Sequence, residues 1–266
     1  ELASDLRSLT LFYLEPLPGN ARVRVTFDGD AVADRFLQLI DADGDGRPGG
    51  VGTITFNTVA TEAIGDTGVE GHVYASEPDP QGGNRPLVGV VVTVDGREET
   101  LRTVTDAQGF FRLSPCPAGR FFVHVDGRTA VGSEWPNGAY YPFVGKAWEA
   151  VAGRTNNLAG GNGVVFLPRV PANALQSVSS TTTTTIGFAP EVVQQNPALA
   201  GVEIFVPPNS LFNEQGTRGG RVGMAPVPPD RLPEPLPPGL NLPLVITIQT
   251  DGAMNFDRPV PVRFPN

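Results

Sequence analysis

Apolar and polar residues alternate along much of this chain. Alternation over short stretches that are bounded by Gly, Pro, Asn or Asp is typical of half-buried β-strands. We expect strands over seven segments: 22–27, 53–56, 90–94, 121–125, 202–206, 244–248 and 260–264. Helical spacing occurs in only two short segments, 31–40 and 190–199, and neither carries a full set of helix caps. The pattern therefore predicts an all-β fold.

Composition refines this prediction. Glycine and proline contribute 32 and 27 of the 266 residues, or about 22% together. This share is below the roughly 25–30% typical of low-complexity disorder, so we expect the chain to fold. Only 8% of residues are aromatic, so each hydrophobic core should be thin. Thin cores suit β-sandwiches, and we expect tandem sandwich modules.

Changes in composition divide the chain into three expected modules. Residues 1–60 form a partial β module, residues 61–67 a linker, residues 68–170 a β-sandwich with the most regular succession of strands, and residues 171–266 a proline-rich C-terminal β module. The third module begins with a Ser/Thr run, 177–185. Because β-branched threonine favours extended backbone, this run is either a strand or an exposed tether. Attachment of O-linked sugar is a third alternative, less favoured than a plain strand or linker.

Charge and hydropathy limit the partners. The formal net charge is −9, the wrong sign for binding a phosphate backbone, so we expect no nucleic-acid partner. No window approaches the roughly 18 consecutive apolar residues of a membrane-spanning helix, so we expect no membrane span. The chain opens on Glu1 rather than on a basic and then apolar signal segment. We therefore expect a soluble chain that is a mature product or an excised piece of something longer.

A single cysteine, Cys116, rules out an intramolecular disulfide and a cysteine metal cluster. It lies between Pro115 and Pro117 with no histidine or cationic residue beside it in sequence. We expect a buried thiol that acts as a small hydrophobe rather than a reactive one.

Residues 68–128 carry the most specific motif. Thr105-Asp106-Ala107-Gln108-Gly109-Phe110-Phe111 is followed by Pro117-Ala118-Gly119. Asp106 and Gly109 suit a tight turn in which the carboxylate accepts local N–H bonds and the glycine takes a positive φ. The stretch resembles the carboxypeptidase regulatory-like domain. That resemblance implies a prealbumin-like seven-stranded sandwich that serves as a structural appendage or surface stalk repeat, with no catalytic site to transfer.

The N-terminal block, residues 8–58, resembles the second half of a bacterial Ig-like domain. The resemblance rests on these segments: 9–12, 15–21, 23–27, Asp34, 41–46 and 53–58. A sandwich of this type needs strands before Leu9, so the module looks incomplete. The C-terminal module also stops abruptly after the expected strand at 260–264. We expect uncovered strand edges at both ends, and such edges invite pairing with another chain.

One acidic loop predicts metal binding. Asp41, Asp43, Asp45 and Gly46 match the start of an EF-hand-type loop, in which alternate acids supply hard oxygen ligands for Ca²⁺. The twelfth position, which should be a bidentate glutamate, is Gly52. The site would be weak or would borrow an oxygen from another acid of this block: Asp28, Asp30 or Asp34. The alternative, which we favour, is a plain acidic, glycine-rich hairpin turn.

The sequence shows no catalytic constellation. His72 and His124 both lie on alternating segments and lack a nucleophile-elbow serine. The glycine-rich segment 160–163 follows no strand-to-helix pattern typical of a nucleotide loop. Four aromatic residues gather nearby in sequence and form either packing between modules, which is favoured, or a sugar-stacking platform: Trp135, Tyr140, Tyr141 and Trp148.

These observations favour a non-enzymatic structural protein. We expect an extracellular or cell-surface location and a subunit or segment of a bacterial surface fibre, filament or stalk. The expected partner is a further copy of the chain, joined head-to-tail through β-strand pairing into a filament. Neighbouring modules of the same chain are the other candidate partners. The alternative function is a carbohydrate-binding or adhesive module that uses the aromatic cluster to hold glycans.

Overall fold

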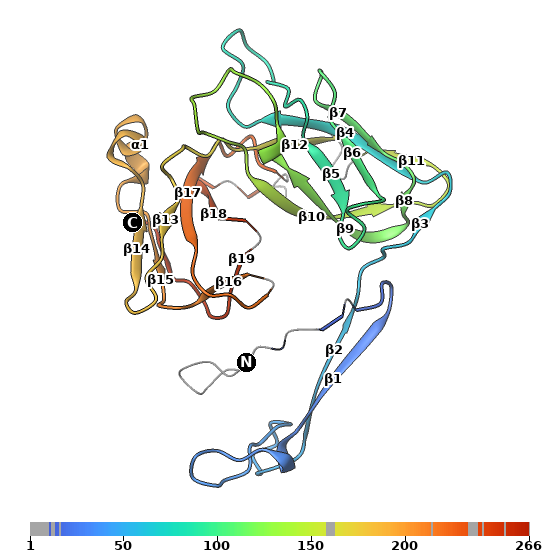
Figure 1. Cartoon of the computed structure of the whole chain (residues 1–266), viewed down its shortest axis with the longest axis vertical. Helices are drawn as coiled ribbons and strands as arrows, with labels where there is room; N and C mark the ends of the chain where they lie inside the picture. Colours follow the sequence, from blue (N-terminus) through green and yellow to red (C-terminus); the bar gives the residue numbers. More distant parts are fainter. Residues whose placement is uncertain are drawn as a thin grey trace.

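The computed structural model describes residues 11, 14–15, 17–157, 163–213, 215–233, 239–240, 242–252 and 254–265. These residues form almost entirely β-structure arranged in several sheets. Figure 1 shows two β-rich bodies beside each other and a long two-stranded hairpin that projects away from them. The fold is thus an all-β sandwich fold, and the prediction drawn from the alternation is confirmed.

The projecting hairpin consists of β1 (Arg22–Asp28) and β2 (Val51–Asn57), which pair antiparallel along their full length. The 3-10 turn η1 (Gly29–Ala31) and a long loop connect them. The helix expected over 31–40 is wrong beyond η1. Asp34 accepts hydrogen bonds from the backbone N–H groups of Phe36 (2.7 Å) and Gln38 (3.0 Å), and this local bonding competes with helical hydrogen bonds.

The central body is a sandwich of two sheets. The first sheet has the order β10 (Phe143–Ala150), β9 (Gly119–Asp126), β5 (Val91–Val94) and β6 (Arg102–Val104). In the second, β4 (Gly68–Ala75) pairs antiparallel with β7 (Phe110–Leu113) and parallel with β11 (Thr155–Asn157) and β12 (Val164–Leu167). Residues of the expected linker also join the body, because β3 (Ala63–Ile64) pairs with β8 (Cys116–Pro117).

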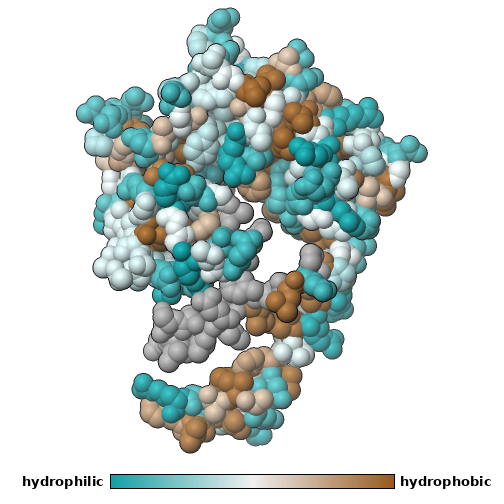
Figure 2. Space-filling view, in the orientation of Figure 1, coloured by the Kyte–Doolittle hydropathy of each residue, from teal (hydrophilic) through white to brown (hydrophobic). Residues whose placement is uncertain are grey.

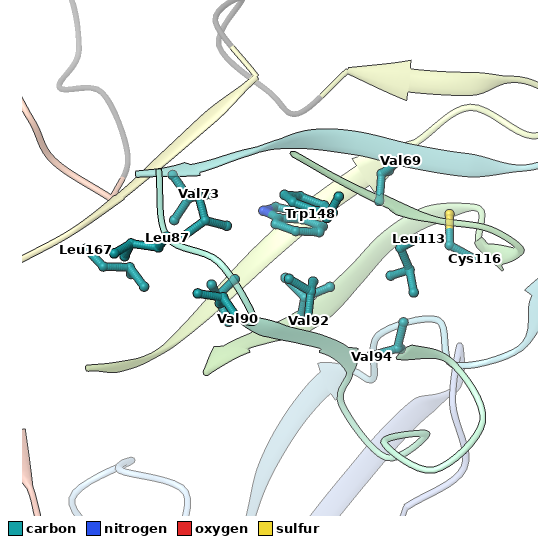
Figure 3. Close-up of a cluster of buried hydrophobic side chains, with 14 of the residues drawn as sticks. Val69, Val73, Leu87, Val90, Val92, Val94, Leu113, Cys116, Trp148 and Leu167 are labelled. Carbon is teal, nitrogen blue, oxygen red and sulfur yellow. The ribbon is translucent and has the colours of Figure 1, made fainter. Parts of the chain in front are cut away.

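Aliphatic and aromatic side chains fill the space between these two sheets (Figure 3). Trp148 of β10 stacks on Phe111 of β7, with ring centroids 5.7 Å apart. It also meets Phe121 of β9 edge to face at 6.4 Å. Trp148 thus links the two sheets from the middle of the core. Cys116 is fully buried at one end of the same core, as predicted, and burial raises the pKa of its thiol to about 11.

The turn before β7 has the predicted construction. The Asp106 carboxylate accepts the backbone N–H groups of Gln108 and Phe110, each at 2.9 Å. Gly109 has φ +72°, and a Cβ at this position would lie 2.5 Å from the carbonyl oxygen of Val73. Only glycine meets both requirements without strain. The motif therefore fixes how the chain passes from β6 in one sheet to β7 in the other.

The C-terminal body has a separate core and three small sheets. Their strand orders are β13 (Gln176–Ser177), β17 (Arg221–Val227), β18 (Val245–Thr250); β14 (Thr184–Gly187), β15 (Glu203–Val206), β20 (Val262–Arg263); and β16 (Leu211–Asn213), β19 (Met254–Phe256). The helical expectation for 190–199 is met by α1 (Pro190–Gln195) and the 3-10 turn η3 (Pro197–Leu199). The Ser/Thr run contributes to β13 and β14 at its two ends, and Ser179 organises the turn between them.

A proline-rich segment of the C-terminal body lies against the central one. Ser76 Oγ donates a hydrogen bond to the Arg231 carbonyl at 3.0 Å, and Lys146 Nζ donates to the Pro233 carbonyl. The Arg231 guanidinium lies 5.3 Å from the ring centroid of Phe166. These contacts join the two bodies through side chains of β10 and β12 and the residue that follows β4.

Candidate functional sites

The acidic loop lies at the far end of the projecting hairpin. The structure brings the carboxylates of Asp41, Asp43 and Asp45 within 4.8 Å of one another, all on exposed side chains. Asp41 accepts the N–H groups of Gly44 (2.8 Å) and Gly46 (2.9 Å). The sequence spacing therefore does converge three hard oxygen ligands, the donor set that Ca²⁺ prefers.

Two of the acids expected to complement this loop accept local backbone hydrogen bonds instead. Asp28 accepts the N–H of Asp30, and Asp34 caps the turn that follows it. Gly52, at the position of the missing glutamate, lies within β2 opposite Phe27. Among the described residues, the group of converging carboxylates thus stays at three. Calcium binding by this loop stays a prediction, and the donor set fits a weak site.

Calcium is expected to raise the melting temperature of the protein. Three carboxylates held close repel one another until a cation neutralises them, and a cation that binds only the folded loop stabilises it. With millimolar calcium we expect a rise of about 2–4 °C. Thermal melts in calcium and in chelator measure this, with Asp43→Asn as the variant that should lose the response. Identical wild-type melts across a millimolar range would remove the site.

The aromatic cluster is divided between core and interface. Trp148 is 3% exposed and Tyr141 is fully buried, so neither ring can stack on a sugar. Trp135 packs edge to face on Tyr141, with centroids 5.2 Å apart. Burial raises the pKa of Tyr141 well above its usual range, and its hydroxyl bonds the Glu77 carboxylate. A sugar platform on Trp148 is therefore ruled out.

Tyr140 is the member of this cluster that lies between the two bodies. It lines a cavity of about 280 Å³ together with Arg128 and Phe143 of the central body and residues of β18 and β19. Burial is the main cause of its raised pKa, with a smaller contribution from Asp251. The favoured expectation of packing between modules holds for Tyr140, whereas Tyr141 and Trp148 pack inside one sandwich.

The two histidines occupy different surroundings. His72 on β4 stacks on Tyr74, with centroids 5.4 Å apart, and meets Phe110 edge to face at 5.3 Å. The Nε2 atom of His124 on β9 lies 3.4 Å from Asp95 Oδ1, and its Nδ1 atom lies 3.7 Å from Glu98 Oε1. Sequence reasoning treated both as ordinary strand residues and missed the acidic neighbours of His124.

One face of the projecting hairpin is apolar. The register places Val23 opposite Phe56 and Val25 opposite Ile54, and directly opposed residues share one face of a ribbon. Ile54 is 67% exposed. Figure 2 shows hydrophobic residues gathered along this projection. We name this face, which consists of Val23, Val25, Phe27, Ile54 and Phe56, the ribbon face. Among the described residues, β1 and β2 pair only with each other.

The comparisons with known proteins carry little information. No family model and no curated protein sequence matches the chain. Among solved structures, the Bacillus anthracis TIE protein aligns with 77% of this chain and 32% of that chain, at 14% identity and a TM-score of 0.23. The chain thus spans about a third of that protein's length. A likeness this weak supports no inference about function.

The remaining sequence expectations are that of no membrane span and those that fall on residues outside the described ranges. Among the described residues, no helix is long and apolar enough to cross a membrane. Three residues of the glycine-rich segment, 160–162, and the residues before Leu11 lie outside the described residues. The interpretation of segment 160–163 and that of the start of the N-terminal module therefore stay predictions.

Proposed function

We propose that this chain is a non-enzymatic structural protein of the cell surface or extracellular space, and that its copies join head-to-tail through β-strand pairing. The observation that carries the proposal is the ribbon face. An isolated two-stranded hairpin is marginal in water, and an apolar hairpin face is stable only when it is covered. The resemblance of residues 68–128 to a stalk-forming sandwich module supports the same function.

The hairpin offers hydrogen-bonding groups at its outer edges and apolar side chains on the ribbon face. Both hairpin strands have one outer edge that is unpaired among the described residues. Val25 and Ile54 form a cross-strand apolar pair, and Phe27 and Phe56 extend the apolar row along the hairpin. A partner strand added to an outer edge would pair with its backbone groups, as in β-strand addition, and side chains of the partner would bury the apolar row.

The C-terminal body supplies the complementary surface. In the described part of the chain, β20 pairs only with β15, so its other edge is unpaired. Exposed apolar residues lie in and just after this strand, namely Val262 and Phe264. We propose that the free edge of the hairpin of one copy pairs with the β20 edge of the next, and that these side chains pack on the ribbon face. The two surfaces lie at different places on one molecule, so the contact is heterologous. Such a contact builds an open filament when the rotation from one copy to the next does not close a ring, and the filament is the assembly that we propose.

Substitution of Ile54 by lysine is expected to abolish self-association. A charge in the centre of the ribbon face would have to be desolvated in the contact. Static light scattering over a range of concentrations measures the mass of wild type and variant. Thr53→Lys is the matched control, because Thr53 neighbours Ile54 on the same strand but points to the opposite face.

The result shows whether the ribbon face is covered by another copy of the chain or by a neighbouring module of the same chain. Growth of wild-type mass with concentration, lost in Ile54→Lys and kept in Thr53→Lys, supports the proposal. A wild type that stays monomeric at high concentration contradicts it. That outcome would leave neighbouring modules of the same chain as the cover of the ribbon face.

A further inference from the structure

Two acidic residues and one histidine converge near the base of the projecting hairpin. Asp95 directly follows β5, Glu98 lies in the turn before β6, and His124 is in the middle of β9. The register pairs Thr93 with His124, and the Asp95 N–H donates to the Phe122 carbonyl at 3.0 Å. Asp95 and His124 are therefore diagonal neighbours on the same outer face of the sheet.

The backbone and aromatic neighbours hold this group in place. The side chain of His124 is 20% exposed, and its ring lies 4.7 Å from that of Phe143 and 5.8 Å from that of Phe122. Glu98 accepts the N–H of Gly96 at 2.9 Å, which fixes the carboxylate in the turn. The imidazole thus contacts two aromatic rings, and its Nε2 faces Asp95 while its Nδ1 faces Glu98.

We propose that His124, Asp95 and Glu98 form a binding site for a zinc-class divalent metal ion. The three side chains offer one nitrogen and two oxygen ligands within 4.8 Å of one another. Neighbouring ligand atoms of a tetrahedral zinc ion lie roughly 3.4 Å apart, given bond lengths of about 2.0–2.2 Å. The separation of His124 Nε2 and Asp95 Oδ1 is 3.4 Å. Imidazole with carboxylates selects zinc-class ions, whereas calcium prefers an all-oxygen set.

The position of this site gives the ion a structural consequence. Asp95 lines a groove of about 930 Å³ whose other wall comes from the hairpin base, including Asn57 and Thr58. Arg97, in the same turn, forms an ion pair with Glu62, just before β3. A bound ion would tie the β5–β6 turn to β9 and so stiffen the place where the hairpin leaves the sandwich. The inference does not depend on self-association.

Isothermal titration calorimetry of the full chain with ZnCl₂ in metal-free buffer tests the proposal. We expect one binding event in the wild type and at least tenfold weaker binding in His124→Ala and in Glu98→Gln. Glu98 is on an exposed turn, so its variant should fold normally, which circular dichroism checks. The second histidine supplies a matched control, because His72 has no ion pair with a carboxylate among the described residues. His72→Ala should keep wild-type affinity.

Two further measurements sharpen the assignment. Zinc should shift the imidazole NMR signals of His124 and leave those of His72 in place. Asp41→Asn should leave zinc affinity unchanged, which separates this site from the acidic loop. Absence of zinc binding in the wild type would overturn the proposal and leave His124 as an ion-pair partner of the two acids. Equal affinity in wild type and His124→Ala would overturn it as well.

Discussion

Replacing Trp148 by alanine is expected to lower the free energy of unfolding of the central sandwich by about 3–5 kcal/mol. The side chain contacts Phe111 in one sheet and Phe121 in the other, so its removal leaves a cavity between the sheets rather than at the surface. Few aromatic residues are available to refill that space. The cost combines lost burial of the indole with lost contacts of the two phenyl rings.

Urea denaturation followed by fluorescence measures this effect. Both tryptophans, Trp135 and Trp148, belong to the central body, so fluorescence of the remaining Trp135 reports this body in the variant. Glu149→Ala is the matched control, because Glu149 is the next residue of β10 and is exposed; its effect should stay within about 0.5 kcal/mol. An unchanged transition in Trp148→Ala would contradict the buried position and restore a sugar-stacking role for the ring.

Replacing Asp257 by alanine is expected to destabilise the C-terminal body by about 2–4 kcal/mol. The Asp257 side chain is only 3% exposed, and its carboxylate pairs with Arg218 at 2.6 Å and with Arg258 at 3.2 Å. The Arg218 side chain is 17% exposed. Removal of the carboxylate breaks both of these ion pairs at a buried position, where breaking a pair costs more than the pair itself contributes.

An exposed pair in the same body provides the control. Arg221 and Asp251 also form an ion pair, at 2.9 Å, but both side chains are about half exposed. Because solvent screens that pair, Asp251→Ala should leave the unfolding transition nearly unchanged. Circular dichroism in urea compares the two variants. If Asp257→Ala and Asp251→Ala had the same unfolding midpoint in urea, burial of the Asp257 carboxylate would add nothing to the stability of the C-terminal body.

Each of the seven segments predicted from local alternation overlaps a strand of the structure, but the described residues form twenty strands. The alternation at 22–27, 53–56 and 121–125 marks β1, β2 and β9, because one face of each strand is more apolar than the other. The segment 260–264 gave only the short strand β20, since Pro261 has no N–H to donate to a ladder. Segment 31–40 failed as a helix because apolar spacing alone ignores the competing hydrogen bonds of Asp34.

Pairing between distant segments could not be predicted from such patterns. β11 (Thr155–Asn157) is wholly polar, so nothing in its sequence marks it as a strand; its place comes from its parallel pairing with β4. The proposed metal site of Asp95, Glu98 and His124 was missed for the same reason. Asp95 and Glu98 read as an ordinary polar turn until the register of β5 and β9 brings His124 beside them.

The position of β4 also affects how the chain can fold. Its partner β7 follows within the same half of the central body, whereas β12 pairs through contacts such as His72 with Val164, far apart in sequence. Closing so long a loop has an entropic cost that must be met before the parallel contacts form. The edge of β4 along residues 72–75 is therefore unpaired until the segment at Val164 has been synthesised. High contact order of this kind favours slow folding and a dependence on protection from aggregation while the chain is incomplete.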